Sequence, residues 1–411
     1  MTRPTDSPVT RLKAPGRLCL RARLVWVGVL LTTAVAVGYH LRHGDVAAPE
    51  DIVPNVSAVE QRSLSSSLPY FSQAWVNPME HTPSSHCSVI SSLPSGDLMA
   101  VWYGGSREGA ADVAVYTSRL SKGGTTWSPP VVAVDRVMAQ NELDRYIKKV
   151  GNAVIFPDHL GKVWMIYVTV TMGGWSGCAL NLKISHDDGR TWGESLRLKL
   201  NPFLNLSTLV RNKPIYASDG RIGLPVYHEM ARKFPQMLWL KPQDNGRPHY
   251  RMRSLPWKPG LIQPTLVALE NDRVLMIMRD GGDERCLRTS FSEDNGWTWS
   301  PTAMSGLPNP DSGIDALRLR DGRILLAYND AERGRESLRL ALSSDGGRNW
   351  TPGACIERGS NREFSYPCLV EDGAGRIHLT YTWQRKRIKH VQFNLAWLEG
   401  ASAPKLTSIA Q

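Results

Sequence analysis

The hydrophobic pattern divides the chain into one apolar run near the N-terminus and a long region of short alternating segments. Residues 24–41 contain no Asp, Glu, Lys or Arg, and about eighteen such residues can just cross a hydrocarbon layer as a helix. Basic residues flank the run, mainly on its N-terminal side, and such a flank stays in the cytoplasm. We therefore expect a single-pass anchor in the inner (cytoplasmic) membrane, with the following residues on the periplasmic or extracellular side. The alternative is a cleaved signal peptide.

From residue 68 onward, apolar and polar positions alternate over short runs that are separated by Asp-Gly and other Gly-containing turns. Residues 162–167 and 323–328 are two short apolar runs that follow such turns, and short runs of this kind bounded by turn residues are typical of strands. The chain of 411 residues contains 35 Gly and 27 Pro, which suits many tight turns. The pattern predicts an all-β domain rather than a helical bundle.

An octapeptide of the form S-x-D-x-G-x-x-W recurs between these segments. Complete copies span residues 185–192, 292–299 and 343–350, and residues 121–127 are a degenerate copy without the Asp. Successive Trp residues of the four copies lie 65, 107 and 51 positions apart, so the long gap holds two units, one of which lacks the motif. A repeat near 50 residues indicates a propeller or array. We predict a six-bladed β-propeller.

The prediction divides the chain as follows. In order along the chain, the predicted parts are a basic cytoplasmic segment (1–23), the anchor (24–41), a tether (42–67), the propeller (68–400) and a tail (401–411). The six blades are expected at about residues 86–135, 148–200, 208–255, 262–305, 313–357 and 364–398, with a closing strand for the last blade near residues 70–76. Asp and Gly in the octapeptide are turn-forming residues, so we assign the motif a structural role at the blade periphery.

Charge and cysteine content narrow the functional classes. The net charge is +11, of which residues 1–42 contribute +6 through seven basic residues and one Asp. Because the basicity is concentrated at one end, nucleic acid is not an expected partner. The six cysteines include no CxxC pair, so we predict no metal site. A Cys355–Cys368 disulfide and buried free thiols are the alternatives for the cysteines.

The octapeptide is similar to the Asp-box, or BNR repeat, of the sialidase (neuraminidase) superfamily. Over residues 80–398 the chain resembles a bacterial sialidase-like protein. Sialidases hold a sugar carboxylate with three arginines and use a Tyr as nucleophile. The resemblance assigns Arg279, which ends the strand 274–279, and Arg335, which precedes the third complete octapeptide, to the second and third arginines. It assigns Tyr366, in Tyr-Pro-Cys-Leu, to the nucleophile.

Three positions depart from the family pattern. His86 stands where the resemblance implies the first arginine. Gln263, sixteen residues before Arg279, stands where the family has the Glu that accepts the Tyr proton, and an amide cannot accept that proton at neutral pH. The acid/base Asp of the family corresponds to a position in the loop after the second strand of blade one, where this chain offers Glu108 or Asp112.

Further candidates lie at strand ends near the expected propeller axis. His228 could bind substrate and Glu229 could replace the missing base, and a solvated loop pair is the alternative for both. Asp315 either hydrogen-bonds sugar hydroxyls or fixes a turn. Trp175, in a Gly-rich loop, is either a sugar-stacking platform or a packed loop residue. Glu363 is a further candidate proton acceptor.

These residues lead to an expected function and its alternatives. We expect an exo-acting hydrolase of terminal sialic acid or a related acidic sugar, needing no metal or cofactor, with an acidic saccharide or glycoconjugate as partner. One alternative is a hydrolase for another acidic sugar, such as a uronic acid. The others are a membrane-tethered carbohydrate-binding propeller without hydrolysis, and a scaffold without a sugar site.

Overall fold

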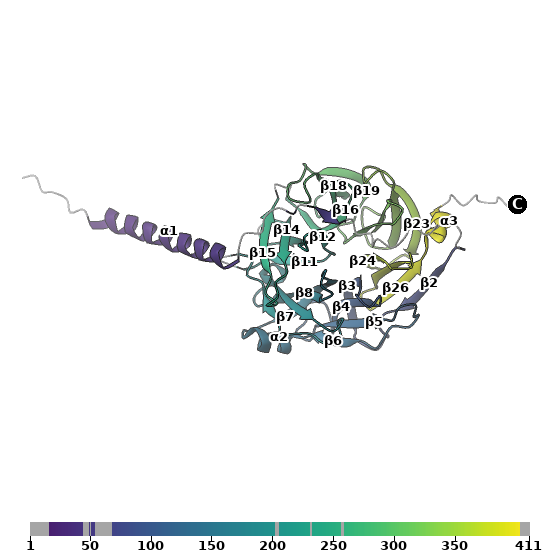
Figure 1. The fold of residues 1–411 in the computed structure, drawn as a ribbon, viewed down its shortest axis with the longest axis horizontal. Coiled ribbons are helices and arrows are strands. Elements are labelled where there is room, and N and C mark those ends of the chain that lie inside the picture. The colour runs from purple at the N-terminus through teal and green to yellow at the C-terminus, as the bar shows by residue number, and fades with distance from the viewer. Residues whose placement is uncertain are drawn as a thin grey trace, which may run out of the picture.

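Six antiparallel sheets form a ring around a central axis in the computed structural model (Figure 1). The structure describes residues 16–43, 49, 51–53, 68–201, 205–230, 232–255 and 259–402. Five of the sheets have four strands and one has six. This architecture confirms the prediction of an all-β, six-bladed propeller, including a third blade without an octapeptide.

Each blade begins at the axis and runs outward, and the strands have the following bounds. They are, blade by blade, β3 (Ser84–Ser92), β4 (Leu98–Gly105), β5 (Ala114–Leu120) and β6 (Val131–Val134); β7 (Lys149–Pro157), β8 (Val163–Val170), β9 (Cys178–Ser185) and β10 (Leu196–Arg197); β11 (Thr208–Val210), β12 (Ile215–Ala217), β13 (Ile222–His228), β14 (Phe234–Lys241), β15 (His249–Ser254) and the added β1 (Ile52–Val53); β16 (Leu261–Ala268), β17 (Val274–Asp280), β18 (Cys286–Ser292) and β19 (Ala303–Pro308); β20 (Asp315–Arg318), β21 (Ile324–Tyr328), β22 (Ser337–Ser343) and β23 (Thr351–Arg358); β24 (Phe364–Glu371), β25 (Ile377–Trp383), β26 (Arg387–Phe393) and β2 (Phe71–Trp75).

The core consists of the faces that neighbouring blades press together. Strands β4, β8, β16 and β17 are buried at every residue, because each lies inside a blade that is covered by another blade on both faces. Such strands are apolar on both sides. The helices, α1 (Gly16–His43), α2 (Arg136–Leu143), the short 3₁₀ turn η2 (Trp175–Gly177) and α3 (Leu395–Ser402), are additions to this ring.

The ring is closed by a strand from the N-terminal side of the propeller. β2 pairs with β26 along its whole length, from Phe71 opposite Phe393 to Trp75 opposite Lys389. The predicted closing strand is therefore confirmed. A second N-terminal strand was not predicted: β1 pairs with β12 of blade three, so the segment 42–67 is not merely a tether.

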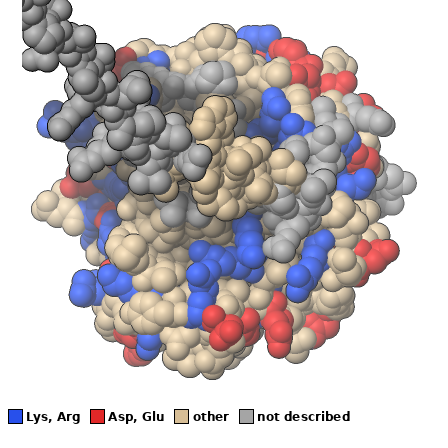
Figure 2. Space-filling view, turned by 90° about the vertical axis from the view of Figure 1, so that its left-hand side faces the viewer, with Lys and Arg blue, Asp and Glu red and all other residues tan. Residues whose placement is uncertain are grey.

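The N-terminal apolar run forms a helix, as predicted. α1 projects from the edge of the ring near β15 (Figure 1). Its described side chains, residues 24–37, are exposed. Among the described residues, however, no helix is long and apolar enough to cross a membrane, so the predicted transmembrane anchor is not supported. On the face from which α1 projects, Lys and Arg side chains are bordered by Asp and Glu (Figure 2). Most of the predicted segment 1–23 and nearly all of the tail 401–411 lie outside the described residues.

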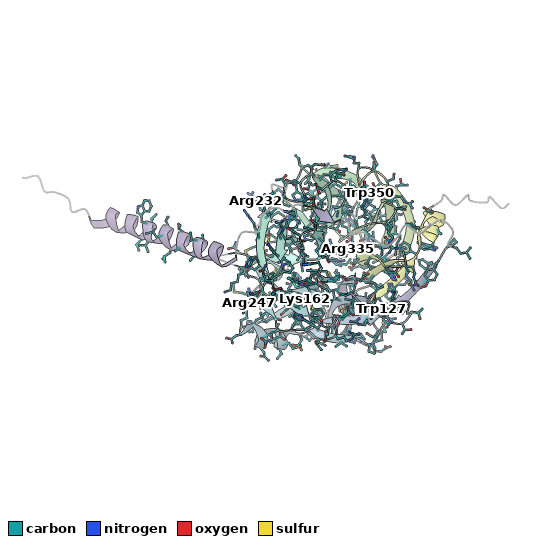
Figure 3. The ribbon with its side chains drawn as sticks, viewed as in Figure 1. Trp127, Lys162, Arg232, Arg247, Arg335 and Trp350 are labelled. Atoms are coloured by element: carbon teal, nitrogen blue, oxygen red, sulfur yellow. The ribbon has the colours of Figure 1, made fainter. Side chains whose placement is uncertain are left out.

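The octapeptides form turns between the third and fourth strands of blades two, four and five, as the sequence predicts. In the last copy, Asp345 accepts hydrogen bonds from the backbone N–H of Asn349 (2.9 Å) and Arg348 (3.1 Å) and from the Ser343 hydroxyl (2.8 Å). Gly347 has φ = 87°, which a residue with a side chain adopts at a cost. In Figure 3, Trp350 lies toward the outside of the ring, whereas Arg335 lies near its centre. The octapeptides therefore shape blade edges and take no part in a central site.

The cysteines follow the prediction of free thiols. The five cysteines whose side chains are described are unbonded, and Cys87, Cys178 and Cys368 are buried. Cys355 is exposed and is not bonded to Cys368.

A buried hydrogen-bond chain joins the first and last blades at the ring closure. Trp127 Nε1 donates to His390 Nδ1 (3.2 Å), the His390 and His378 rings meet through Nε2 and Nδ1 (3.0 Å), and His378 Nε2 lies 3.2 Å from a carboxylate oxygen of Asp372. Because an indole N–H can only donate, the Nδ1 atom of His390 must be unprotonated. Burial, with His378 adding to it, lowers the pKa of His390 to about 3.

Acid should therefore weaken the ring closure through His390. In the unfolded chain His takes up a proton near pH 6.5, so between that pH and about 3 the unfolded state binds more protons, and the free energy of unfolding falls as the pH falls. This residue alone contributes a loss of roughly 2 kcal/mol between pH 7.5 and 5. Urea unfolding of the wild type should show that extra loss relative to His390→Gln. The exposed His186→Gln should behave as the wild type does, and an equal pH dependence in all three proteins would contradict the assignment.

Candidate functional site

Irregular inner strands mark one end of the central axis. The register of the innermost strand shifts in four blades, between His86 and Val89, Gly151 and Ala153, Ile262 and Thr265, and Ser365 and Cys368. Within three of these shifts one residue has a left-handed backbone: Cys87 (φ = 60°), Gln263 (φ = 50°) and Tyr366 (φ = 54°). Bulges re-aim side chains, and left-handed backbone at residues other than Gly costs free energy that functional sites retain. The fold thus concentrates strain where two predicted site residues lie.

Tyr366 is surrounded by rings and guanidinium groups. The His86 ring stands perpendicular to the Tyr366 ring, with centroids 4.7 Å apart. The guanidinium carbons of Arg211 and Arg335 lie 5.3 Å and 5.5 Å from the Tyr366 ring centroid. A Cβ atom added to Gly313 would come within 2.7 Å of the ring, so only glycine leaves room there. Tyr366 is therefore held in a tight, cationic environment and remains half-buried.

The two predicted arginines meet beside Tyr366 through one loop residue. Arg279 donates from Nε to the Asp311 carboxylate and from Nη1 to Gln263 Oε1 (2.9 Å). Arg335 donates from Nη2 to the Asp311 carbonyl oxygen (3.2 Å). Burial opposes the charge of Arg279, but Tyr366 and Asp311 beside it raise its pKa above the usual value. Residues from blades four, five and six thus converge in one place.

A third arginine, which the sequence analysis did not single out, completes this arrangement. Arg385 lies in the turn between β25 and β26, donates from Nε to Glu363 (2.7 Å) and pairs through Nη1 with Glu108. Glu363 also accepts from Arg335 Nη1 (3.1 Å) and from the Ser365 hydroxyl (2.8 Å). Arg385 follows the second strand of its blade, much as Arg279 ends the second strand of blade four, and this shared position is the signal that could have identified it.

His86 and Gln263, the two main departures from the resemblance, both lie in this site. His86 is 1% exposed, and its Nδ1 lies 3.1 Å from the Thr382 hydroxyl. Burial lowers the pKa of His86 well below its usual value, and Arg385 and two other arginines add to the effect. His86 is therefore neutral and does not replace the charge of an arginine. Gln263 accepts from Arg279 and lies 3.3 Å, through Nε2, from the Tyr227 hydroxyl.

Three of the predicted carboxylates, Glu108, Asp112 and Glu229, occupy different environments. Glu108 reaches the site and pairs with Arg385. Asp112 is exposed and accepts from the backbone N–H and hydroxyl of Ser106 (2.9 Å each). Those hydrogen bonds lower the pKa of Asp112, so this residue holds the loop and is not suited to donate a proton. Burial raises the pKa of Glu229, although Lys233 and Arg279 oppose the change. Glu229 is thus the carboxyl group here most ready to carry a proton.

Asp315 is bonded within the chain, which agrees with the alternative that it fixes local structure and not with a contact to sugar hydroxyls. Its side chain is fully buried. Its oxygens accept from the ammonium of Lys213, the hydroxyl of Thr265 (2.8 Å) and the backbone N–H of Leu369 (2.7 Å). These bonds join blades three, four, five and six beneath the site and leave no oxygen for a ligand.

His228 and Trp175 also differ from the predicted substrate contacts. His228 stacks on Phe234, with ring centroids 4.8 Å apart, on the side of β13 opposite to Tyr227. The Trp175 ring lies so close to the backbone that a Cβ atom at Gly151 would come within 2.4 Å of it, and Lys149 Nζ lies 4.2 Å from the ring centroid. The Trp175 ring therefore packs against Gly151 and Lys149 of the chain itself, which agrees with the alternative of a packed loop residue.

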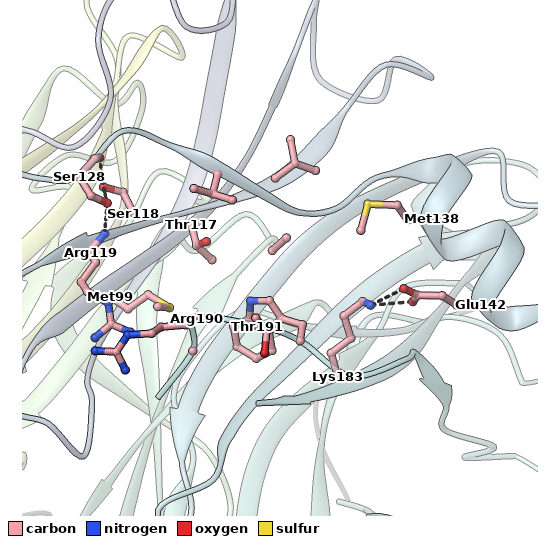
Figure 4. Close-up of a pocket in the computed structure, with 15 residues that line it drawn as sticks. Met99, Thr117, Ser118, Arg119, Ser128, Met138, Glu142, Lys183, Arg190 and Thr191 are labelled. Carbon is pink, nitrogen blue, oxygen red and sulfur yellow. Dashed lines mark hydrogen bonds and ion pairs between the residues drawn. The ribbon is translucent and has the colours of Figure 1, made fainter. Parts of the chain in front are cut away.

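A cavity of about 430 Å³ lies elsewhere, between the outer parts of blades one and two (Figure 4). Its charged lining groups already have partners: Lys183 bonds to Glu142 (2.7 Å), and Arg119 pairs with Asp97 and Asp188 (2.8 Å each). We regard it as a crevice between blades, distinct from the site at the axis.

Comparison with known proteins agrees with the fold and the motifs. Residues 96–379, more than half of the chain, match the model of the BNR repeat-like domain family. Two curated sialidases are similar to the chain, one from Micromonospora viridifaciens (23% identity over 385 residues, 80% of this chain) and one from Bacteroides fragilis strain YCH46 (24% over 338 residues, 74% of this chain). The solved Hadza microbial sialidase Hz136 superimposes with a TM-score of 0.67 at 19% identity, over 79% of this chain and 69% of that chain.

The similarity does not extend over the whole of the curated relatives. The chain spans 54% and 60% of the lengths of the two sialidases. The family match, together with the propeller and its Asp-boxes, establishes that the chain belongs to the BNR repeat-like domain family and is a sialidase-like superfamily protein.

Proposed function

We propose that the protein is an exo-acting glycoside hydrolase of sialidase type that removes a terminal sialic acid or a related acidic sugar. The observation that carries the proposal is the convergence of Tyr366 with the guanidinium groups of Arg279 and Arg335. The similarity to sialidases supports a glycoside hydrolase at the family level.

The arginines would bind the carboxylate of the sugar. A guanidinium binds a carboxylate with two parallel hydrogen bonds and stays charged at any physiological pH. Arg385 would supply the third cation in place of the neutral His86. In the free protein Arg385 pairs with Glu108, so an incoming carboxylate that draws Arg385 toward itself would release Glu108 to take up a proton.

The reaction would then proceed in two displacements with retention of configuration. The Tyr366 oxygen attacks the anomeric carbon, the bond to the leaving oxygen breaks, Glu108 protonates that oxygen, and the phenol proton passes to Glu229. Water next attacks the glycosyl-tyrosine, giving its proton to Glu108, while the bond to the Tyr366 oxygen breaks and the phenoxide regains its proton from Glu229. Glu229 is the proposed acceptor because burial raises its pKa toward neutrality.

A carbohydrate-binding propeller without hydrolysis is the second candidate. Gln263, bonded to Arg279 and lying beside Tyr227, cannot accept a proton from Tyr366. If no other group takes that proton, the same cations would bind an acidic sugar and leave it intact. His86, being neutral, also favours an acidic sugar other than sialic acid, such as a uronic acid, as an alternative substrate of the hydrolase.

Arg279→Ala should weaken binding of an acidic sugar. Breaking an Arg–carboxylate pair in a partly dry site costs about 2–5 kcal/mol, so the Kd for 3'-sialyllactose should rise roughly 10²-fold or more. Isothermal titration calorimetry measures this change. Arg348→Ala, which removes an exposed arginine of the blade-five Asp-box, is the matched control and should bind as the wild type does. An unchanged affinity in Arg279→Ala would rule out this carboxylate site.

Tyr366→Phe should abolish turnover of a fluorogenic sialoside, because the variant lacks the attacking oxygen. We expect a loss of kcat of about 10³-fold or more, with binding of 3'-sialyllactose retained. Tyr381→Phe removes a different phenol of the same blade, one that donates to Glu357 (2.7 Å), and should keep its activity. Turnover that survives in Tyr366→Phe would exclude Tyr366 as the nucleophile, and binding without turnover in the wild type would favour the second candidate.

A further inference from the structure

Arg211 is a buried cation that the proposed reaction does not use. It follows β11 at the inner edge of blade three and is 1% exposed. Its Nη2 donates to the Pro367 carbonyl oxygen (2.9 Å), its Nη1 makes a long contact with Asn212 Oδ1 (3.4 Å), and its buried Nε has no acceptor. No carboxylate of the described residues pairs with it.

Burial of such an unpaired cation lowers the stability of the folded state. Burying a guanidinium without a counter-charge removes its hydration, and proteins rarely do so unless the charge has a use. The described groups that contact Arg211 are a carbonyl, an amide and the ring of Tyr366, whose centroid lies 5.3 Å from the guanidinium carbon. An aromatic face attracts a cation, and the face of a phenoxide, which carries a full negative charge, attracts it more strongly.

The hydrogen bond to Pro367 also fixes the backbone of Tyr366. Tyr366 has φ = 54° inside the bulge of β24, a conformation that costs about 1–3 kcal/mol and persists only when the surroundings enforce it. Arg211 donates a hydrogen bond to the carbonyl oxygen of Pro367, the residue after Tyr366. One side chain from blade three therefore both stabilises the bulged backbone at Tyr366 and places a positive charge near its ring.

The cations against the Tyr366 ring are guanidinium groups. Arg211 and Arg335 lie 5.3 Å and 5.5 Å from the ring centroid, and Arg279 lies beside the phenol. The His86 ring also faces Tyr366, and burial lowers the pKa of His86, so this ring adds no charge. Negative charge that develops on the Tyr366 oxygen during the proposed reaction would therefore lie close to positive charges of the chain.

We propose that Arg211 is a positioning residue for Tyr366, which holds the bulged backbone of the nucleophile and stabilises the phenoxide as it forms. The inference rests on the proposed function, in which the Tyr366 oxygen attacks the sugar. In this role Arg211 supplies part of the activation that a glutamate at position 263 would provide, while the proton itself still passes to Glu229.

The first test needs no substrate. Tetranitromethane nitrates phenoxides, so the nitration rate of each Tyr reports how readily it ionises and how accessible it is, and peptide mass mapping measures the rates separately. Tyr146, which is 61% exposed, serves as the internal reference. In the wild type at pH 8, the ratio of the Tyr366 rate to the Tyr146 rate gives the baseline against which the variants are compared.

The variants then separate charge from structure. In Arg211→Met the ratio of the Tyr366 rate to the Tyr146 rate should fall about tenfold, and in Arg211→Lys, which keeps the charge and one donor, it should recover at least in part. Circular dichroism and thermal unfolding check that each variant is folded. An unchanged ratio in folded Arg211→Met, or no recovery in folded Arg211→Lys, would contradict the electrostatic role. If Arg211→Met does not fold, Arg211→Lys still decides, because this variant keeps the charge and a tenfold loss of the ratio in it would contradict the role.

A kinetic measurement distinguishes failure of this inference from failure of the proposed function. If the wild type hydrolyses a sialoside, Arg211→Met should lower kcat about 10²-fold or more, as expected for the loss of one electrostatic stabiliser, with KM changed less than about threefold. Equal effects on kcat and KM, or none, would reject Arg211 as the positioning residue while leaving Tyr366 in its role. Undiminished turnover by Tyr366→Phe would instead reject Tyr366 as the nucleophile. The nitration ratios would then still test whether Arg211 acts electrostatically on Tyr366.

Discussion

Closure of the ring is the constraint on which the site depends. A propeller brings the first strands of all its blades to one axis, and it can do so only if the last blade is sealed, here by the antiparallel pairing of β2 with β26. Sealing also removes the exposed strand edges that an open sheet would present. Because every inner strand ends at the same place, Arg211, Gln263, Arg335 and Tyr366 become neighbours although they come from four blades.

Charge pairing keeps the crowded arginines in place while no ligand is bound. Each guanidinium at the rim has a carboxylate of the chain beside it: Arg279 has Asp311, Arg335 has Glu363, and Arg385 has both Glu363 and Glu108. The pairs restrict the rotamers of these long side chains, so much of their ordering precedes binding, and the Arg385–Glu108 pair is the one that the proposed reaction would exchange. Such preorganisation lowers the entropic cost of recognition, and a bound anion then has to compete with carboxylates of the protein itself.

The sequence was sufficient for features that local chemistry determines, and insufficient for those that burial determines. The octapeptide spacing predicted the six blades, and the strand contexts of Arg279, Arg335 and Tyr366 selected three residues that lie close together in the structure. Nothing local distinguished Arg211 from a solvated arginine, because its neighbours come from other blades, and for Arg385 the local signal was its position after the second strand of its blade. The sequence left Asp315 open between a ligand contact and a turn for the same reason, since complete burial behind three donors is a tertiary property. The apolar run 24–41 does form a helix, but length and hydropathy together did not support a membrane span.

The short strand β1 extends the structural unit beyond what the repeats suggest. Ile52 is 5% exposed and packs in a cluster with Ile215 and Trp239 of blade three, and the Pro49 carbonyl accepts a hydrogen bond from Asn295, inside the Asp-box of blade four. The segment therefore contacts blades three and four and links them on the outside of the ring. A recombinant chain that began at residue 68 would uncover the edge of β12 and the apolar side chains behind it, inviting self-association, so the folded unit includes residues 52 and 53.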